Sequence, residues 1–148
     1  MTRAVHRTIH IDQPPERVWQ AVVDPALIQN WFSPGTPWQR TELAPGGRLF
    51  AVGYESMAAV IEAVEAPSTF CFRWDAPAPA PQLTTRSTYR LQADGGGTRL
   101  TFTETIEGDL SPEAHEQRVA ATEDGYAHAF ENLKAWLEGR ALPHPEGL

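Results

Sequence analysis

The sequence contains a single cysteine, Cys71, among its 148 residues. One cysteine forms no intramolecular disulfide and cannot supply the thiolate cluster of a structural zinc or iron–sulfur centre. The chain also has no run of about 20 apolar residues, the length that a membrane-spanning helix needs. Its first twelve residues carry charges and histidines instead of the unbroken apolar stretch of a signal peptide. We therefore expect a protein of a reducing compartment, the cytoplasm.

Basic residues are scarce as well. The 12 lysines and arginines are outnumbered by 19 acidic residues, which gives a formal net charge of -7. A negative field repels nucleic-acid phosphates and anionic lipid surfaces. We expect neither nucleic acid nor membrane as a partner, and we assign the charge mainly to solubility.

The motifs of nucleophilic, phosphate-binding and zinc chemistry are missing. The Gly95-Gly96-Gly97 run follows Asp94 between two alternating segments and therefore predicts a hairpin turn. His6 and His10 share one face of the first predicted strand, but no third ligand is spaced to complete a metal site. No metal and no cofactor are expected. Catalysis by holding a reactive substrate against one or two polar groups leaves no such motif, and it stays open.

The length and composition fit one domain over residues 1–148. With 41% hydrophobic residues, five Trp and six Phe, the chain can build one sizeable core. We place that core within residues 4–139 and expect the proline-rich tail, 140–148, to be flexible.

The N-terminal half begins with an alternating strand over residues 4–12, which the Pro14-Pro15 pair ends. Helical spacing and proline at the first position predict a helix from Pro15 to Val23 and a short one over residues 26–31. Turn residues then divide the chain into short strands, which indicates an antiparallel meander. Residues 76–81 alternate Ala and Pro and predict a stiff exposed loop. The expected strands cover residues 38–43, 48–54, 57–65, 69–75, 83–92 and 98–106.

A long helix is predicted near the C-terminus. Ser111 suits its N-cap, Pro112 its first position and Gly139 its end. Its length is about 27 residues, or roughly 40 Å. His115 and His128 are expected to be exposed. One apolar stripe is formed by Val119, Thr122, Tyr126, Ala129, Phe130, Leu133, Trp136 and Leu137.

Several short motifs accompany this order of elements. They are Pro15, Val18-Trp19, Ala21, Trp31-Phe32, Pro45-Gly46-Gly47, Phe70, Phe72, Trp74, Gly97 to Thr101, Gly125-Tyr126 and Leu133. In these residues and in its order of elements the chain resembles the START-like, or helix-grip (SRPBCC), superfamily, which includes the Bet v allergens and polyketide cyclases. It is most similar to the bacterial branch named for the activator of heat-shock protein 90 ATPase. The resemblance implies an α+β fold in which a curved antiparallel sheet of six or seven strands wraps the long C-terminal helix.

The sequence departs from these relatives at two positions. Tyr126 stands where they often carry Trp, and Thr103-Glu104-Thr105 stands where many carry a histidine. Both changes alter the polar lining of a cavity between sheet and helix, so no relative's ligand can be transferred to this chain.

Two residues are candidates for chemistry in that cavity. Glu104 shares its strand parity with Leu100 and Phe102, so it points inward if they do, as a ligand anchor or a general base. The alternative is a bend near the strand end that leaves it solvated. Tyr89 could offer its hydroxyl to a ligand, although a core tyrosine bonded to a backbone carbonyl is the simpler interpretation.

Aromatic residues at strand and helix ends predict the walls and mouth of the cavity. Trp74 lies near a strand end, where a mouth is expected, and Trp31 could instead pin the short helices to the sheet. The predicted ligand-binding residues are Trp31, Phe32, Tyr54, Met57, Phe72, Trp74, Tyr89, Phe102, Glu104, Tyr126 and Phe130.

Three functions remain open at this point. The first is a module that binds a small hydrophobic or aromatic molecule without changing it. The second is a cyclase, dehydratase or hydrolase acting on a small aromatic or polyketide-like substrate, with Glu104 and Tyr89 as acid-base candidates. The third, implied by the family name alone, is a co-chaperone that stimulates an ATPase. Monomer and homodimer are both permitted.

Overall fold

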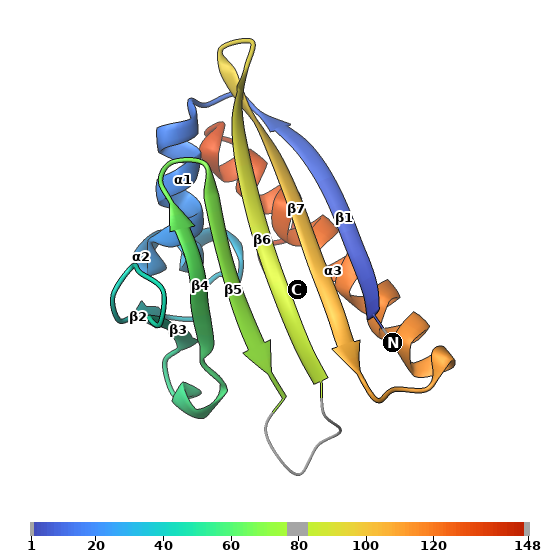
Figure 1. Cartoon of the computed structure of the whole chain (residues 1–148). Coiled ribbons are helices and arrows are strands. Elements are labelled where there is room, and N and C mark those ends of the chain that lie inside the picture. Colours follow the sequence, from blue (N-terminus) through green and yellow to red (C-terminus); the bar gives the residue numbers. More distant parts are fainter. Residues whose placement is uncertain (1, 77–82, 147–148) are drawn as a thin grey trace.

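The computed structural model describes residues 2–76 and 83–146, and within them the chain forms one seven-stranded antiparallel sheet with a long helix packed on one face (Figure 1). The strands lie in the order β1-β7-β6-β5-β4-β3-β2, so the first strand pairs with the last. They are β1 (Thr2–Ile11), β2 (Trp38–Arg40), β3 (Arg48–Ala51), β4 (Ala59–Glu65), β5 (Thr69–Asp75), β6 (Leu83–Asp94) and β7 (Gly97–Gly108).

The predicted α+β helix-grip class is confirmed, with differences at strand ends. The expected strand from residue 57 begins only at Ala59, because Glu55–Met57 forms a 3₁₀ turn. β2 and β3 end earlier than expected, at Arg40 and Ala51. β6 and β7 extend further, up to the tight turn at Gly95 and Gly96, which both adopt positive φ. The predicted Ala-Pro loop lies largely outside the described residues.

Three helices follow from local signals in the sequence. α1 (Pro15–Val23) and α2 (Pro25–Trp31) each begin with a proline, and the Asp24 side chain between them caps α2 by accepting from Ala26 N at 3.0 Å. α3 (Pro112–Leu137) begins as predicted, with Ser111 Oγ accepting from Ala114 N at 3.1 Å. All three helices bury one face against the sheet or one another.

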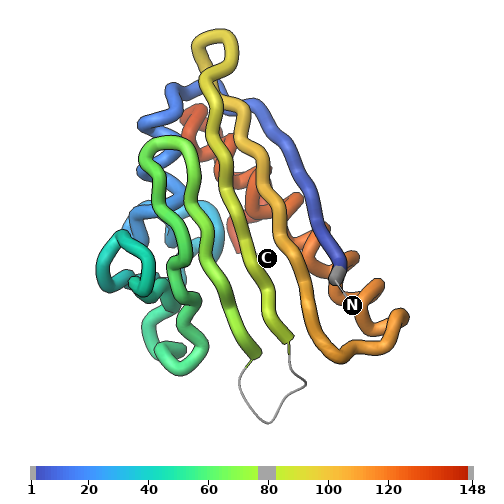
Figure 2. The backbone as a smooth tube through the Cα atoms, in the orientation of Figure 1, coloured from blue at the N-terminus to red at the C-terminus, as the bar shows by residue number. Residues whose placement is uncertain are grey.

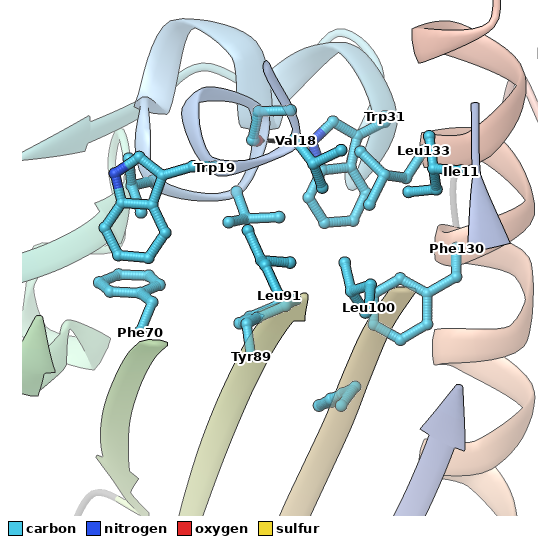
Figure 3. Close-up of a cluster of buried hydrophobic side chains, with 14 of the residues drawn as sticks. Ile11, Val18, Trp19, Trp31, Phe70, Tyr89, Leu91, Leu100, Phe130 and Leu133 are labelled. Carbon is cyan, nitrogen blue, oxygen red and sulfur yellow. Dashed lines mark hydrogen bonds between the residues drawn. The ribbon is translucent and has the colours of Figure 1, made fainter. Parts of the chain in front are cut away.

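The packed core lies between the C-terminal half of α3, the short helices and the sheet (Figure 3). Phe130 and Leu133 of α3 are buried there with Leu91 of β6 and Leu100 of β7. Trp31 stacks on Phe130, with ring centroids 6.3 Å apart. Large buried side chains therefore occupy this end of the space between helix and sheet.

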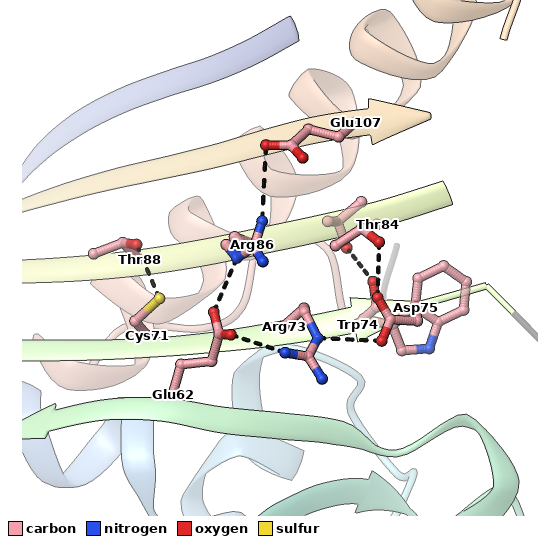
Figure 4. A network of polar contacts seen from close by, with 10 residues as sticks. Glu62, Cys71, Arg73, Trp74, Asp75, Thr84, Arg86, Thr88 and Glu107 are labelled. Atoms are coloured by element: carbon pink, nitrogen blue, oxygen red, sulfur yellow. Dashed lines mark hydrogen bonds and ion pairs between the residues drawn. The ribbon is translucent and has the colours of Figure 1, made fainter. Parts of the chain in front are cut away.

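The other face of the sheet is polar (Figure 4). Glu62 accepts from Arg73 and Arg86 at 3.0 and 3.1 Å, and Arg86 also approaches Glu107 on β7 at 3.7 Å. A register shift in β4 between Ile61 and Ala63 places Glu62 at an irregular position of the strand. This alternation of apolar inner and charged outer side chains fixes which face of each strand meets α3.

One expectation about the C-terminal part differs from the structure. His115 is fully buried and its Nε2 lies 3.2 Å from Gly108 O. It stands four residues before Val119, so it continues the sheet-facing stripe of α3. In the described part of the tail, the backbone of His144 exchanges two hydrogen bonds with the Asn132 side chain, at 2.8 and 2.9 Å, and the flexibility of the tail stays a prediction. The trace in Figure 2 follows the same course, with β1 beside β7 and α3 behind them.

Candidate functional site

A cavity of about 910 Å³ lies between the sheet and the N-terminal half of α3. Its walls come from strands β2 to β7 of the sheet, from α1, α2 and the 3₁₀ turn, and from residues 118–128 of α3. This volume is within the range that holds a drug-sized molecule. The lining residues are Val22, Ile28, Trp31, Phe32, Trp38, Leu49, Ala51, Tyr54, Met57, Ala59, Phe72, Trp74, Thr85, Ser87, Tyr89, Glu104, Arg118, Ala121, Thr122, Asp124, Gly125, Tyr126 and His128.

The cavity exists because the residues that face one another across it are small. α3 presents Ala121 and Gly125 at this level, whereas one to three turns later it presents Phe130 and Leu133. On the sheet, Thr85 and Ser87 occupy the inward positions of β6. Gly in a helix interior costs up to about 1 kcal/mol relative to Ala. The sequence therefore accepts a local loss of stability where it leaves this space open.

Glu104 is the only acidic side chain of the described residues that is buried, with 6% of its surface exposed. β7 places it on the inner face, as its parity predicted, directly opposite Ser87 of β6. Ser87 Oγ donates a hydrogen bond to Glu104 Oε1 at 2.7 Å. This short, charge-assisted contact offsets part of the cost of burying a carboxylate.

Burial raises the pKa of Glu104, and three neighbours act in the opposite direction: the Ser87 hydrogen bond, the charge of Arg118 and the hydroxyl of Tyr126. Burial also raises the pKa values of Tyr89 and Tyr126, and the negative charge of Glu104 adds to both shifts. Both phenols consequently stay neutral and can donate hydrogen bonds into the cavity.

Two donors on the cavity wall lack a partner among residues 2–76 and 83–146. Arg118 Nε and Trp38 Nε1 are buried and make no hydrogen bond there. Buried donors are seldom left unsatisfied, because each one has lost its hydrogen bonds to water. These two N–H groups lie just beneath the cavity surface, and no hydrogen bond of the Arg118 guanidinium to residues 2–76 or 83–146 is present, so this side chain can donate to a molecule in the cavity through its outer nitrogens.

The aromatic side chains of the wall are fixed by contacts of their own. Trp31 Nε1 donates to Ala21 O at 2.9 Å, so this residue both lines the cavity and ties α2 to α1. Trp74 Nε1 donates to Met57 O at 3.0 Å and joins β5 to the turn before β4. Tyr54 and Met57 are exposed and mark the mouth.

Nine of the eleven predicted ligand-binding residues lie on the cavity wall. The other two, Phe102 and Phe130, are fully buried behind it. Phe102 stacks on Tyr89 with centroids 5.2 Å apart, and Phe130 meets Phe102 edge-to-face at the same distance. Their inward parity was predicted correctly, but neighbouring rings cover them, so they support the wall from behind. The roles of the lining residues remain predictions.

Sequence reasoning missed several wall residues, above all Ser87, Arg118 and Trp38. Ser87 shares its parity with Tyr89, and Arg118 stands four and eight residues before Thr122 and Tyr126, so both patterns were present in the sequence. His6 and His10 are exposed on β1, and no group of three metal-ligating side chains occurs in the described ranges. None of the helices in those ranges is long and apolar enough to cross a membrane.

Comparison with known proteins agrees with this architecture. Residues 12–138 match the family model described as Activator of Hsp90 ATPase homolog 1-like protein. The chain is similar to the solved structure of protein MLL2253 from Mesorhizobium loti, with 24% identity, a TM-score of 0.76, and coverage of 95% of this chain and 100% of that one. CalU16 from Micromonospora echinospora is 23% identical with a TM-score of 0.74, over 97% of this chain and 80% of its own.

A third similar structure is Ara h 8.0201, which is 15% identical with a TM-score of 0.70 over 95% of this chain and 100% of that one. No curated protein matches the sequence. At these identities the solved structures establish the shared fold and nothing about a ligand.

Proposed function

This chain belongs to the family of Activator of Hsp90 ATPase homolog 1-like proteins, and we propose that it binds a small hydrophobic or aromatic molecule in its cavity. The fold of this family is that of ligand-binding helix-grip proteins. The observation that carries the proposal is a space of about 910 Å³ with aromatic walls, left open by small residues on both sides. A ligand that buries about 200 Å² of apolar surface gains about 5 kcal/mol before the costs of association. We place this activity in the cytoplasm.

A titration with N-phenyl-1-naphthylamine, a neutral dye that fluoresces in apolar surroundings, tests the proposal. The wild-type protein should bind it saturably with one-to-one stoichiometry. Gly125→Leu places a side chain inside the cavity and should weaken binding at least tenfold. Ala120→Leu adds the same side chain at an exposed position of α3 and should bind as the wild type does. Equal binding by both variants would show that the dye does not occupy this cavity.

One observation favours a second candidate, an enzyme of the cyclase, dehydratase or hydrolase type on a small aromatic or polyketide-like substrate. Glu104, whose pKa is raised by burial, and the neutral hydroxyls of Tyr89 and Tyr126 share one cavity. A carboxyl group whose pKa is raised by burial is a stronger base when ionised than a solvated one, which suits it to take up and return a proton. Glu104→Gln should then abolish turnover while dye binding is kept. Full turnover in this variant would exclude Glu104 as the acid-base group.

A further inference from the structure

Two opposite charges, Glu104 on β7 and Arg118 on α3, line the cavity, and the third charged residue of the wall, Asp124, is exposed. Glu104 and Ser87 contribute from the sheet, and Arg118 faces the same cavity from the N-terminal half of α3. Tyr126, one of the aromatic wall residues, completes the group with its hydroxyl near Glu104. Most of the remaining wall is apolar, with Leu49, Phe72 and Trp74 as examples. The cavity consequently has a polar end that can bind a particular chemical group selectively.

Glu104 and Arg118 require opposite hydrogen-bonding groups on a ligand. An ionised carboxylate only accepts hydrogen bonds, and a guanidinium only donates them. Arg118 acts on Glu104 through its charge, but its Nε has no hydrogen-bond partner anywhere in the described ranges. Ser87 uses one of the roughly four lone-pair sites that a carboxylate offers, so Glu104 can accept further bonds.

This pairing discriminates between simple ligand charges. An anion such as a carboxylate satisfies Arg118 but is repelled by Glu104. A cation satisfies Glu104 but is repelled by Arg118. A neutral group with only an acceptor gives Glu104 no donor, and one with only a donor gives the Arg118 guanidinium no acceptor. Each buried group left without a partner lowers the affinity, because it loses its hydrogen bonds to water and gains none from the ligand.

We propose that the ligand contains an apolar aromatic ring system and a neutral group in which a hydrogen-bond donor lies beside an acceptor. This inference rests on the proposed function, the binding of a small molecule in this cavity. The donor bonds to Glu104 and the acceptor receives a hydrogen bond from the Arg118 guanidinium. A carboxamide is the simplest group of this kind, and a hydroxyl next to a carbonyl is another.

Four naphthalenes with the same ring body test this chemistry by displacement of N-phenyl-1-naphthylamine at pH 7.5. They are naphthalene-2-carboxamide, methyl 2-naphthoate, sodium 2-naphthoate and 2-methylnaphthalene. The carboxamide should bind about tenfold more tightly than the other three, as expected for hydrogen bonds to charged partners. Glu104→Met and Arg118→Met should each remove this preference while the dye still binds. Arg90→Met, which changes an exposed arginine on the outer face of β6, should keep it.

The outcomes separate the two proposals. Tightest binding of 2-naphthoate, or equal binding of the carboxamide and the hydrocarbon, overturns the inference and leaves apolar binding in the cavity intact. Absence of saturable binding by the dye itself overturns the proposed function, and the inference falls with it. The ranking on the wild-type protein decides the question even where a variant does not fold.

Discussion

Ser87 and Glu104 lie directly opposite each other on β6 and β7, and the Ser87 hydroxyl donates a 2.7 Å hydrogen bond to the Glu104 carboxylate. The pair sits on the inner face of the sheet, where the small Ala121 and Gly125 of α3 help to leave the cavity open. The carboxylate is therefore held in place by the sheet and faces a space that no other side chain fills.

Ser87→Ala should destabilise the protein by about 1–3 kcal/mol at pH 7, because a buried carboxylate loses its donor. The hydrogen bond favours the ionised form, so its loss raises the pKa of Glu104 further. The destabilisation should therefore shrink as the pH falls through the raised folded pKa of Glu104 and the carboxyl takes up its proton. Urea unfolding at pH 7 and pH 4 measures both values. Thr88→Ala, on the opposite face of β6, serves as the control and should show no such pH dependence.

Glu104→Gln should change how stability varies with pH. The pKa of Glu104 is raised in the folded state, so folding favours the protonated form. The wild-type protein consequently loses stability as the pH rises from the unfolded value, about 4.3, through the raised folded value. Glutamine has no proton to lose, so the variant should lack this decline. The stability of the variant relative to the wild type should therefore be greater at pH 8 than at pH 4. Parallel unfolding curves for the two proteins across this range would contradict the assignment.

Local and alternating signals in the sequence were sufficient for much of this arrangement. Ser111 and Pro112 began α3 where predicted, and the parity of β7 correctly placed Glu104 on the inner face. The depth of the cavity could not be predicted, because it depends on which side chains of α3 meet which side chains of the sheet. Phe102 and Phe130 were inward as expected, yet rings from neighbouring elements cover them.

Other errors arose where distant segments meet. His115 was expected in solvent because its neighbours are polar. The chain reverses directly after β7, however, so the first turns of α3 pack against the end of this strand and bury His115 beside Gly108 O. The contact between the tail and α3 could not be predicted either. Asn132, which bonds to the backbone of His144, lies on a buried face of α3 and gave no signal in the tail itself.

Asn132→Ala should release the described part of the tail. The Asn132 side chain donates to Trp31 O at 3.2 Å and exchanges two hydrogen bonds with the His144 backbone. Its loss leaves buried backbone groups without partners, which costs about 1–3 kcal/mol. We expect a lower urea midpoint and faster proteolysis after Arg140. Glu131→Gln weakens only the 2.7 Å contact with the exposed side of His144 and should have a much smaller effect.

Glu138→Gln should weaken the protein at neutral pH but not in strong acid. Burial alone would raise the pKa of Glu138, but hydrogen bonds from Lys134, Arg140 and Asp12 N outweigh it and lower the pKa to about 2. A depressed folded pKa adds stability above the unfolded value, and that stability is lost as the pH falls from about 4.5 towards 2. We expect a loss of about 1–2 kcal/mol at pH 7. Glu116→Gln, at an exposed position of α3, is the control.

The pairing of β1 with β7 also sets the order in which this protein can be completed during synthesis. Thr2 pairs with Glu107 and Ile11 with Thr98, so β1 leaves the ribosome long before its only neighbour in the sheet. The hairpins from β2 to β6 can form while β1 waits, and the sheet closes only when β7 and then α3 follow. Since pairing over such separations is slow, closure of β1 onto β7 should limit the folding rate. The cavity, whose walls include β7 and α3, is therefore among the last features to form.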